Sequence, residues 1–150
     1  MEWSTAESRF KDRFFLLALL AGPLIWVLMW LIDLSTVEPQ VVTVKFQQLV
    51  LVGLVYPVLE ELAFRGGLQS SLLHFPAGRS RHLGLTHANF VTSVVFVAFH
   101  FIIHAPLWAL LVFIPSLIFG ELRDRYQSTR PAIFLHSYYN LGFYLTLYLT

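Results

Sequence analysis

The chain has 150 residues, of which 57% are hydrophobic and 13% are charged, and its net charge is +1. This composition is typical of a membrane protein, and it lacks the basic excess of nucleic-acid-binding proteins, so nucleic acid is excluded as a partner. The sequence contains no cysteine, which excludes disulfides, thiolate nucleophiles and sulfur ligands for a metal.

Five apolar segments are predicted as membrane-spanning helices, each of which needs about 20 residues. The first, residues 14–32, is too long for the apolar core of a signal peptide, so we expect a retained anchor. The second runs from residue 41 to about 73 and contains a cluster of charged residues. The others are 90–105, 107–120 and 132–149, of which the first two are short. The sequence thus predicts an all-α polytopic membrane bundle that forms one domain, residues 1–150.

Basic residues lie at alternate ends of the predicted spans. Cytoplasmic segments of membrane proteins carry an excess of lysine and arginine. The opposite ends hold only Lys45. We therefore predict a cytoplasmic N-terminus and a C-terminus outside, with these residues on the cytoplasmic side: Arg9, Lys11, Arg13, Arg79, Arg81, Arg123, Arg125 and Arg130.

Three charged residues lie inside the second span, in the stretch LEELAFRGGL. An ionisable side chain at membrane depth is unfavourable unless it is paired or hydrated, so it marks a candidate functional site. Glu61 and Arg65 share one helical face and can pair, whereas Glu60 points about 100° away from Glu61. The alternative is a cytoplasmic helix end whose charges are solvated.

Other polar side chains fall within the third and fifth spans. His100 follows Phe96 by one helical turn, and a packing role is its alternative. His136 and Asn140 are spaced i, i+4 and project from one face, where hydrogen bonding between helices is the alternative. The remaining histidines are assigned to the membrane interface (His104) or to a solvated loop (His74, His82 and His87).

These polar groups are predicted to lie at comparable depth. Measured from the cytoplasmic helix ends, Glu60, His100, His136 and Asn140 lie at about 18, 16, 8 and 14 Å. A carboxylate and a histidine can deprotonate a water, and a second histidine and an amide can stabilise an oxyanion, which suits amide hydrolysis. One glutamate and two histidines also form a zinc set, although the HExxH spacing is missing.

Three motifs in order resemble one family: EELAFRG at 60–66, FVAFH at 96–100 and HSYYN at 136–140. They are similar to the EExxxR, FxxxH and HxxxN motifs of the CPBP family, the CAAX prenyl proteases and bacteriocin-processing (Abi) enzymes. The resemblance implies an intramembrane glutamate endopeptidase with a conical active-site cavity and no metal or other cofactor. It implies these roles: Glu60 as general base, His100 as its partner in holding the water, His136 and Asn140 as the oxyanion hole, and Glu61 with Arg65 as support of the site.

The chain departs from the eukaryotic CAAX proteases of this family, which have more spans, so we expect a more open substrate groove. Short bacterial relatives resemble processing enzymes for C-terminal sorting segments or for peptide leaders. The resemblance therefore implies a protein of the bacterial plasma membrane whose partners are the bilayer and a membrane-anchored protein or peptide substrate. Two alternatives remain, a non-catalytic immunity or scaffold protein and a small transporter or channel, and the absence of inverted repeats argues against the transporter.

Overall fold

The structure, a computed structural model, describes residues 12–32 and 46–149. These residues form helices and one short hairpin, in agreement with the predicted all-α class. Helix α2 (Arg13–Ile32) coincides with the first predicted span. Three further helices follow the hairpin: α7 (His87–His100), α9 (Phe113–Tyr126) and α10 (Arg130–Leu149), with the short α8 (Pro106–Leu111) before α9.

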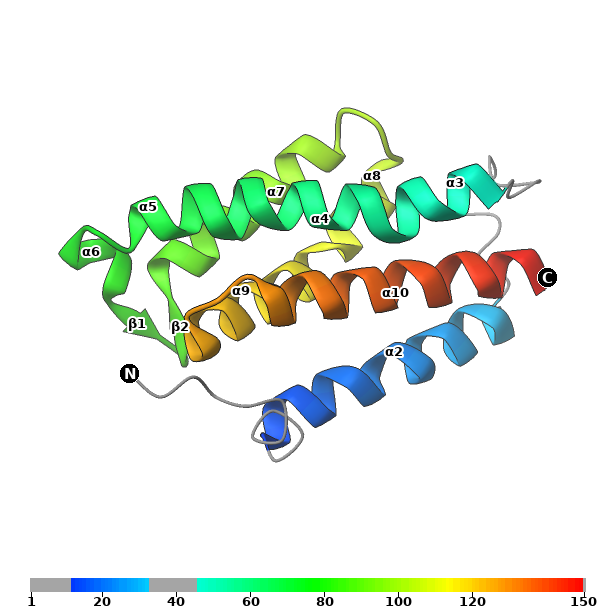
Figure 1. Ribbon diagram of the computed structural model, residues 1–150, viewed down its shortest axis with the longest axis horizontal. Coiled ribbons are helices and arrows are strands. Elements are labelled where there is room, and N and C mark those ends of the chain that lie inside the picture. The colour runs from blue at the N-terminus through cyan, green and yellow to red at the C-terminus, as the bar shows by residue number, and fades with distance from the viewer. Residues whose placement is uncertain (1–11, 33–45, 150) are drawn as a thin grey trace.

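The second predicted span is one long helix, residues 46–72, whose start at 41–45 lies outside the described residues. It is continuous because the backbone stays in the right-handed helical region at each junction within it (Figure 1). Two π-helical stretches interrupt the α-helical geometry within it. Its parts are α3 (Phe46–Val50), η2 (Leu51–Val55), α4 (Tyr56–Glu61), η3 (Leu62–Gln69) and α5 (Ser70–Leu72).

Each π stretch has a carbonyl that is bonded by a side chain. In a π-helix the backbone bonds connect residues five apart, which disturbs the regular ladder at its ends. The amide of Asn140 in α10 donates to the carbonyl of Val52 at 2.8 Å, and the hydroxyl of Ser70 donates to the carbonyl of Arg65 at 2.8 Å. Gly53 is buried against Leu141, so α10 packs directly on the first π stretch. The long helix and α10 therefore stabilise each other near the middle of the bundle.

The polar segment between the second and third predicted spans, residues 74–89, contains α6 (Pro76–Arg79) and a hairpin of β1 (Arg81–His82) and β2 (Leu85–Thr86). Leu83 and Gly84 make the two-residue turn, with φ of 50° and 85°. Positive φ at both turn residues fits the right-handed twist of paired strands. Helix α7 begins earlier than predicted because Thr86 caps it, its hydroxyl accepting from the N–H of Asn89 at 3.0 Å.

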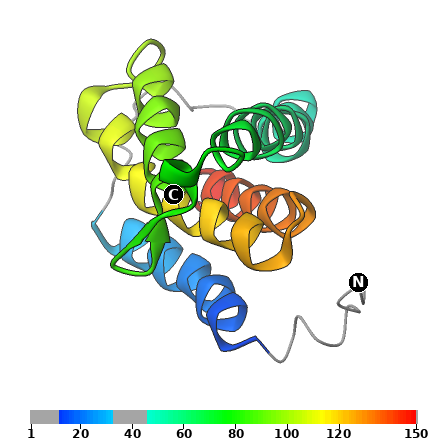
Figure 2. The same cartoon turned by 90° about the vertical axis from the view of Figure 1, so that its left-hand side faces the viewer.

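The main helices run in alternating directions along the molecule (Figure 1). Helix α9 packs between α7 and α10, and α10 also contacts α2 and the long helix. Seen from the hairpin end, α10 therefore lies inside the bundle, with α2 on one side and the long helix on another (Figure 2). The fourth predicted span ended at residue 120, whereas α9 continues to Tyr126 and ends where Gln127 adopts φ 48°.

The helices carry large apolar side chains on their outer surface. Leu24 of α2 is 72% exposed and Ile114 of α9 is 63% exposed. By length and composition, one helix among the described residues is long and apolar enough to cross a membrane, Pro106–Tyr126, and the shorter apolar helices are Arg13–Leu28 and His87–His100. The predicted number of five spans is therefore not confirmed by this criterion.

The basic segments assigned to the cytoplasm meet at the hairpin end of the bundle. Arg81 and Arg125 both pair with Glu121, at 2.6 and 2.9 Å, and Arg125 also lies 3.8 Å from Asp12. The ion pairs thus bring together the start of α2, the hairpin and the end of α9. This arrangement is compatible with the predicted orientation, which a fusion experiment can test.

The orientation predicts the side of each connection. Reporter fusions after Asp33, Ser80, Pro106, Thr129 and Thr150 are expected to report outside, inside, outside, inside and outside, because five spans alternate from a cytoplasmic N-terminus. Paired reporters, one active only in the cytoplasm and one active only outside it, show on which side of the membrane each fusion point lies. Two adjacent fusions on the same side would remove a span from the predicted topology.

Candidate active site

The predicted pair of Glu61 and Arg65 is present in the long helix. Nε of Arg65 lies 3.2 Å from Oε2 of Glu61, and both side chains are 0% exposed. Because a buried charge without a partner is strongly destabilising, each of these residues depends on the other. The alternative of solvated charges at a helix end is therefore wrong for this pair.

Arg65 also connects the long helix to α9. Its Nη2 donates to the carbonyl of Ser116 at 2.8 Å and to the Ser116 hydroxyl at 2.7 Å. The guanidinium carbon lies 4.8 Å from the ring centre of Phe96 and 5.7 Å from that of Phe119. Arg65 is thus held by one carboxylate, two α9 oxygens and two aromatic faces, which leaves little freedom to the side chain.

His136 of α10 lies between the two glutamates. Its Nδ1 is 2.9 Å from Oε1 of Glu61, and its Nε2 is 3.6 Å from Oε2 of Glu60. Because an ionised carboxylate can only accept a hydrogen bond, Nδ1 carries a proton when Glu61 is ionised. The imidazole also stacks on Phe119, with ring centres 4.7 Å apart and planes 19° apart. The ring is therefore fixed in orientation, with Nε2 towards Glu60.

The two adjacent glutamates differ in exposure. The Glu61 side chain is 0% exposed, whereas that of Glu60 is 33% exposed. The helical geometry that separates their directions thus places one carboxylate in an internal pair and leaves the other accessible. Of the two glutamates, Glu60 is therefore the one that a water or a substrate can reach.

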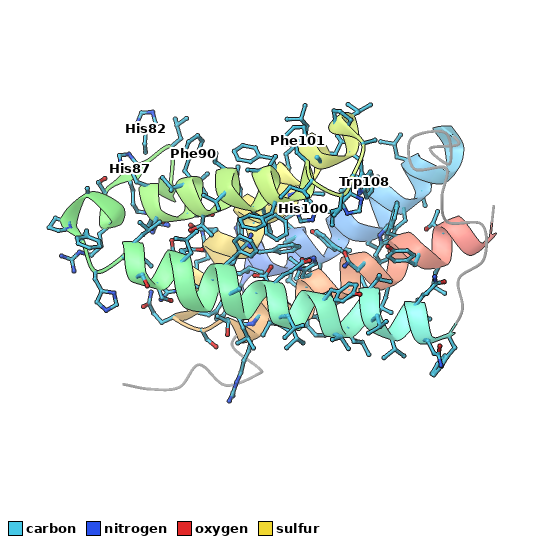
Figure 3. The ribbon with its side chains drawn as sticks, turned by 90° about the horizontal axis from the view of Figure 1, so that it is seen from above. His82, His87, Phe90, His100, Phe101 and Trp108 are labelled. Carbon is cyan, nitrogen blue, oxygen red and sulfur yellow. The ribbon has the colours of Figure 1, made fainter. Side chains whose placement is uncertain are left out.

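His100 reaches the same region through Phe96. Nδ1 of His100 donates to the carbonyl of Phe96 at 2.9 Å, which leaves Nε2 as the nitrogen for another partner. Phe96 is 2% exposed, and its ring centre lies 4.3 Å from that of His100 and 6.1 Å from that of His136. Figure 3 shows His100 among the helices, whereas His82 and His87 lie at the hairpin end. The three histidines assigned to the solvated loop, His74, His82 and His87, are all exposed, as predicted.

Asn140 is positioned one turn beyond His136 on α10. One N–H of its amide bonds to Val52 in the first π stretch, and the amide has a second N–H for a ligand. The structure thus brings Glu60, Glu61, Arg65 and His136 into a connected set. His100 joins this set through Phe96, while the described contact of Asn140 is with the backbone of the long helix.

Several residues near the site were not singled out from the sequence. Ser116 and Phe119 belong to α9, which carries none of the three motifs, and they hold Arg65 and His136. The small polar Ser116 within the apolar stretch FIPSLIFG is the signal that could have revealed this contact. His104 was assigned to the membrane interface, yet its ring stacks on that of His100, with centres 5.4 Å apart.

Among residues 12–32 and 46–149, no group of three or more histidine, aspartate or glutamate side chains is arranged to hold a metal ion. The Glu60–Glu61–His136 set is instead linked internally, because Glu61 is occupied by Arg65 and by Nδ1 of His136.

Comparison with protein families matches residues 42–142 to the Rce1-like family, described as type II CAAX prenyl endopeptidase Rce1-like. The chain belongs to this family. The match covers most of the chain and includes every predicted site residue, so the resemblance based on the three motifs is confirmed. Rce1-like membership makes the chain a membrane protein of a protease family. No significant match was found among curated proteins or among solved structures.

Proposed function

We propose that the chain is an intramembrane endopeptidase in which Glu60 activates a water to hydrolyse a peptide bond of a membrane-associated protein or peptide. The observation that carries this proposal is the difference between the adjacent carboxylates: Glu61 is buried in an ion pair, whereas Glu60 is 33% exposed beside His136. A general base must reach water and must not be neutralised by a permanent partner. Glu60 meets both conditions.

His136 is the second group that the proposed reaction uses. Its Nδ1 lies 2.9 Å from Oε1 of Glu61, and its Nε2 faces the more accessible Glu60. The buried Glu61 has Arg65 as its ion-pair partner, which avoids the large penalty of an isolated charge. When Nε2 of His136 carries a proton, it is a suitable donor to an oxyanion.

The reaction follows from these positions. Glu60 takes one proton from the water, and the water oxygen attacks the peptide carbonyl carbon. Nε2 of His100 accepts a hydrogen bond from the second O–H of the water, because Nδ1 is already a donor to Phe96. That hydrogen stays on the attacking oxygen, which becomes part of the carboxylic acid product. The oxyanion receives hydrogen bonds from Nε2–H of His136 and from the second N–H of Asn140. The C–N bond then breaks, and the proton on Glu60 passes to the leaving amine, which regenerates the carboxylate.

The substrate class follows from the membrane setting and from the family. The Rce1-like family name specifies a CAAX prenyl endopeptidase, which supports a C-terminal CAAX-like tail as substrate. The other substrates compatible with the proposal are a C-terminal sorting segment and a leader peptide. A chain with exposed apolar side chains along its helices would meet any of these at the bilayer surface.

Proteoliposomes can test this function against the two alternatives. Purified chain in liposomes is incubated with membrane-anchored peptides that end in a prenylated CAAX tail, the unprenylated tail, a sorting segment or a leader. We expect cleavage of at least one peptide class, with the new termini identified by mass spectrometry. Ion or solute flux without cleavage would favour a transporter, and intact peptides without flux would favour an immunity or scaffold protein.

A further inference from the structure

His104 returns to the face of His100 after the end of α7. The N–H of His104 bonds to the carbonyl of His100 at 2.9 Å, which closes one more helical turn. The ring centres of the two histidines are 5.4 Å apart and their planes differ by 20°. The three residues between them, Phe101, Ile102 and Ile103, are 45%, 75% and 74% exposed, whereas His104 is half-buried. This turn therefore directs one polar ring inward and three apolar side chains outward.

The rings of Phe96, His100 and His104 lie in a row, in which His104 stacks on His100 and the Phe96 ring is tilted by 38° from that of His100. Their spacing of four residues places them along one stripe, and neighbouring ring centres are 4.3 and 5.4 Å apart. His100 has a flat ring on each side along this stripe. The row of rings thus extends from the buried Phe96 through His100 to the half-buried His104.

We propose that His104 is a positioning residue, whose ring holds that of His100 against Phe96 so that Nε2 of His100 stays directed at the water that Glu60 activates. This inference rests on the proposed function. The bond from Nδ1 to the Phe96 carbonyl restrains the imidazole of His100 at one nitrogen, which still permits it to swing. A flat ring on its other side restricts that swing, and a displacement of about 1 Å in a reacting group can lower a rate by about 100-fold.

A matched pair of variants separates ring stacking from filling of space. His104→Phe keeps a flat ring but removes the ring nitrogens. His104→Leu fills a similar volume but has no ring. We expect kcat of His104→Leu to fall by about 10 to 100-fold with little change in KM, as a misplaced reacting group predicts. His104→Phe should restore most of the rate. Thermal stability should be the same in both variants, because the residue lies at the edge of the bundle.

Nitrogen NMR of labelled histidine provides a readout that does not depend on cleavage. In the wild type and in His104→Phe, His100 should show one ordered tautomer protonated at Nδ1. In His104→Leu its signals should shift or broaden. A rate of His104→Leu equal to that of the wild type, or a His104→Phe variant as slow as His104→Leu, would overturn the positioning role. Full activity of Glu60→Gln would instead overturn the proposed function, so the two failures are distinguishable.

Discussion

Glu60→Gln is expected to fold normally and to lose cleavage by several orders of magnitude. The amide keeps the size and much of the hydrogen bonding of the carboxylate, but it cannot accept the proton of the attacking water. Because Glu60 is 33% exposed and makes only a 3.6 Å contact with His136, its neutralisation should leave the Glu61–Arg65 pair in place. Single-turnover cleavage in proteoliposomes and thermal unfolding in detergent measure the two parts of this prediction.

One matched control and two further measurements accompany Glu60→Gln. Glu121→Gln makes the same chemical change at the hairpin end of the bundle, where Glu121 pairs with Arg81 and Arg125, and should retain cleavage. Removing one oxyanion donor by Asn140→Ala should lower the rate less, by about 100 to 1000-fold. Chelators should have no effect. Loss of activity with chelator and its recovery with zinc would replace the general base by a metal-bound water.

Arg65→Ala is expected to destabilise the protein by about 3 to 5 kcal/mol, as in other buried pairs broken from one side. The variant leaves the carboxylate of the fully buried Glu61 with Nδ1 of His136 but without Arg65, and it removes both hydrogen bonds to Ser116. The yield of folded protein in detergent and the melting temperature should both fall, and activity should fall with them. Thermal unfolding followed by circular dichroism measures the change.

The surface variant Arg79→Ala is the matched control for Arg65→Ala, because Arg79 is exposed at the end of α6. Its melting temperature should stay close to that of the wild type. The double variant Glu61→Gln with Arg65→Met should recover part of the stability, since a buried pair replaced as a whole leaves no uncompensated charge. An Arg65→Ala protein with unchanged thermal stability would show that the pair has no structural role.

The sequence could predict those parts of the site that depend on helical periodicity. Glu61 and Arg65 are four residues apart, so their pairing follows from any helix, and the separation of Glu60 from Glu61 follows from the angle between neighbouring residues. The ends of α2 and α10 were predictable for a similar reason, because long apolar segments have few other folds in a membrane. The three family motifs added the assignment of polar groups from three different helices to one site.

Other parts depend on contacts that periodicity does not encode. The packing of Ser116 and Phe119 against Arg65 and His136 is set by where α9 crosses the long helix, which a single sequence does not specify. The inward turn of His104 depends on the hydrogen bond that continues the helix beyond His100. The hairpin was missed because its strands have only two residues each, too short for an alternating pattern.

Because of the two π stretches, the number of residues in the long helix matters as much for its contacts as the identity of those residues. A π turn uses one residue more than an α turn, so each stretch acts like a one-residue insertion that advances the helix by about 100°. Deleting one residue between Arg65 and Gln69 would leave the Glu60–Arg65 turn unchanged but would rotate Gln69 away from Gly120 and Asp124, its partners in α9. The rotational phase between the Glu60–Arg65 turn and the hairpin end of the long helix is thus fixed by residue count, and substitutions in this segment should be tolerated better than deletions.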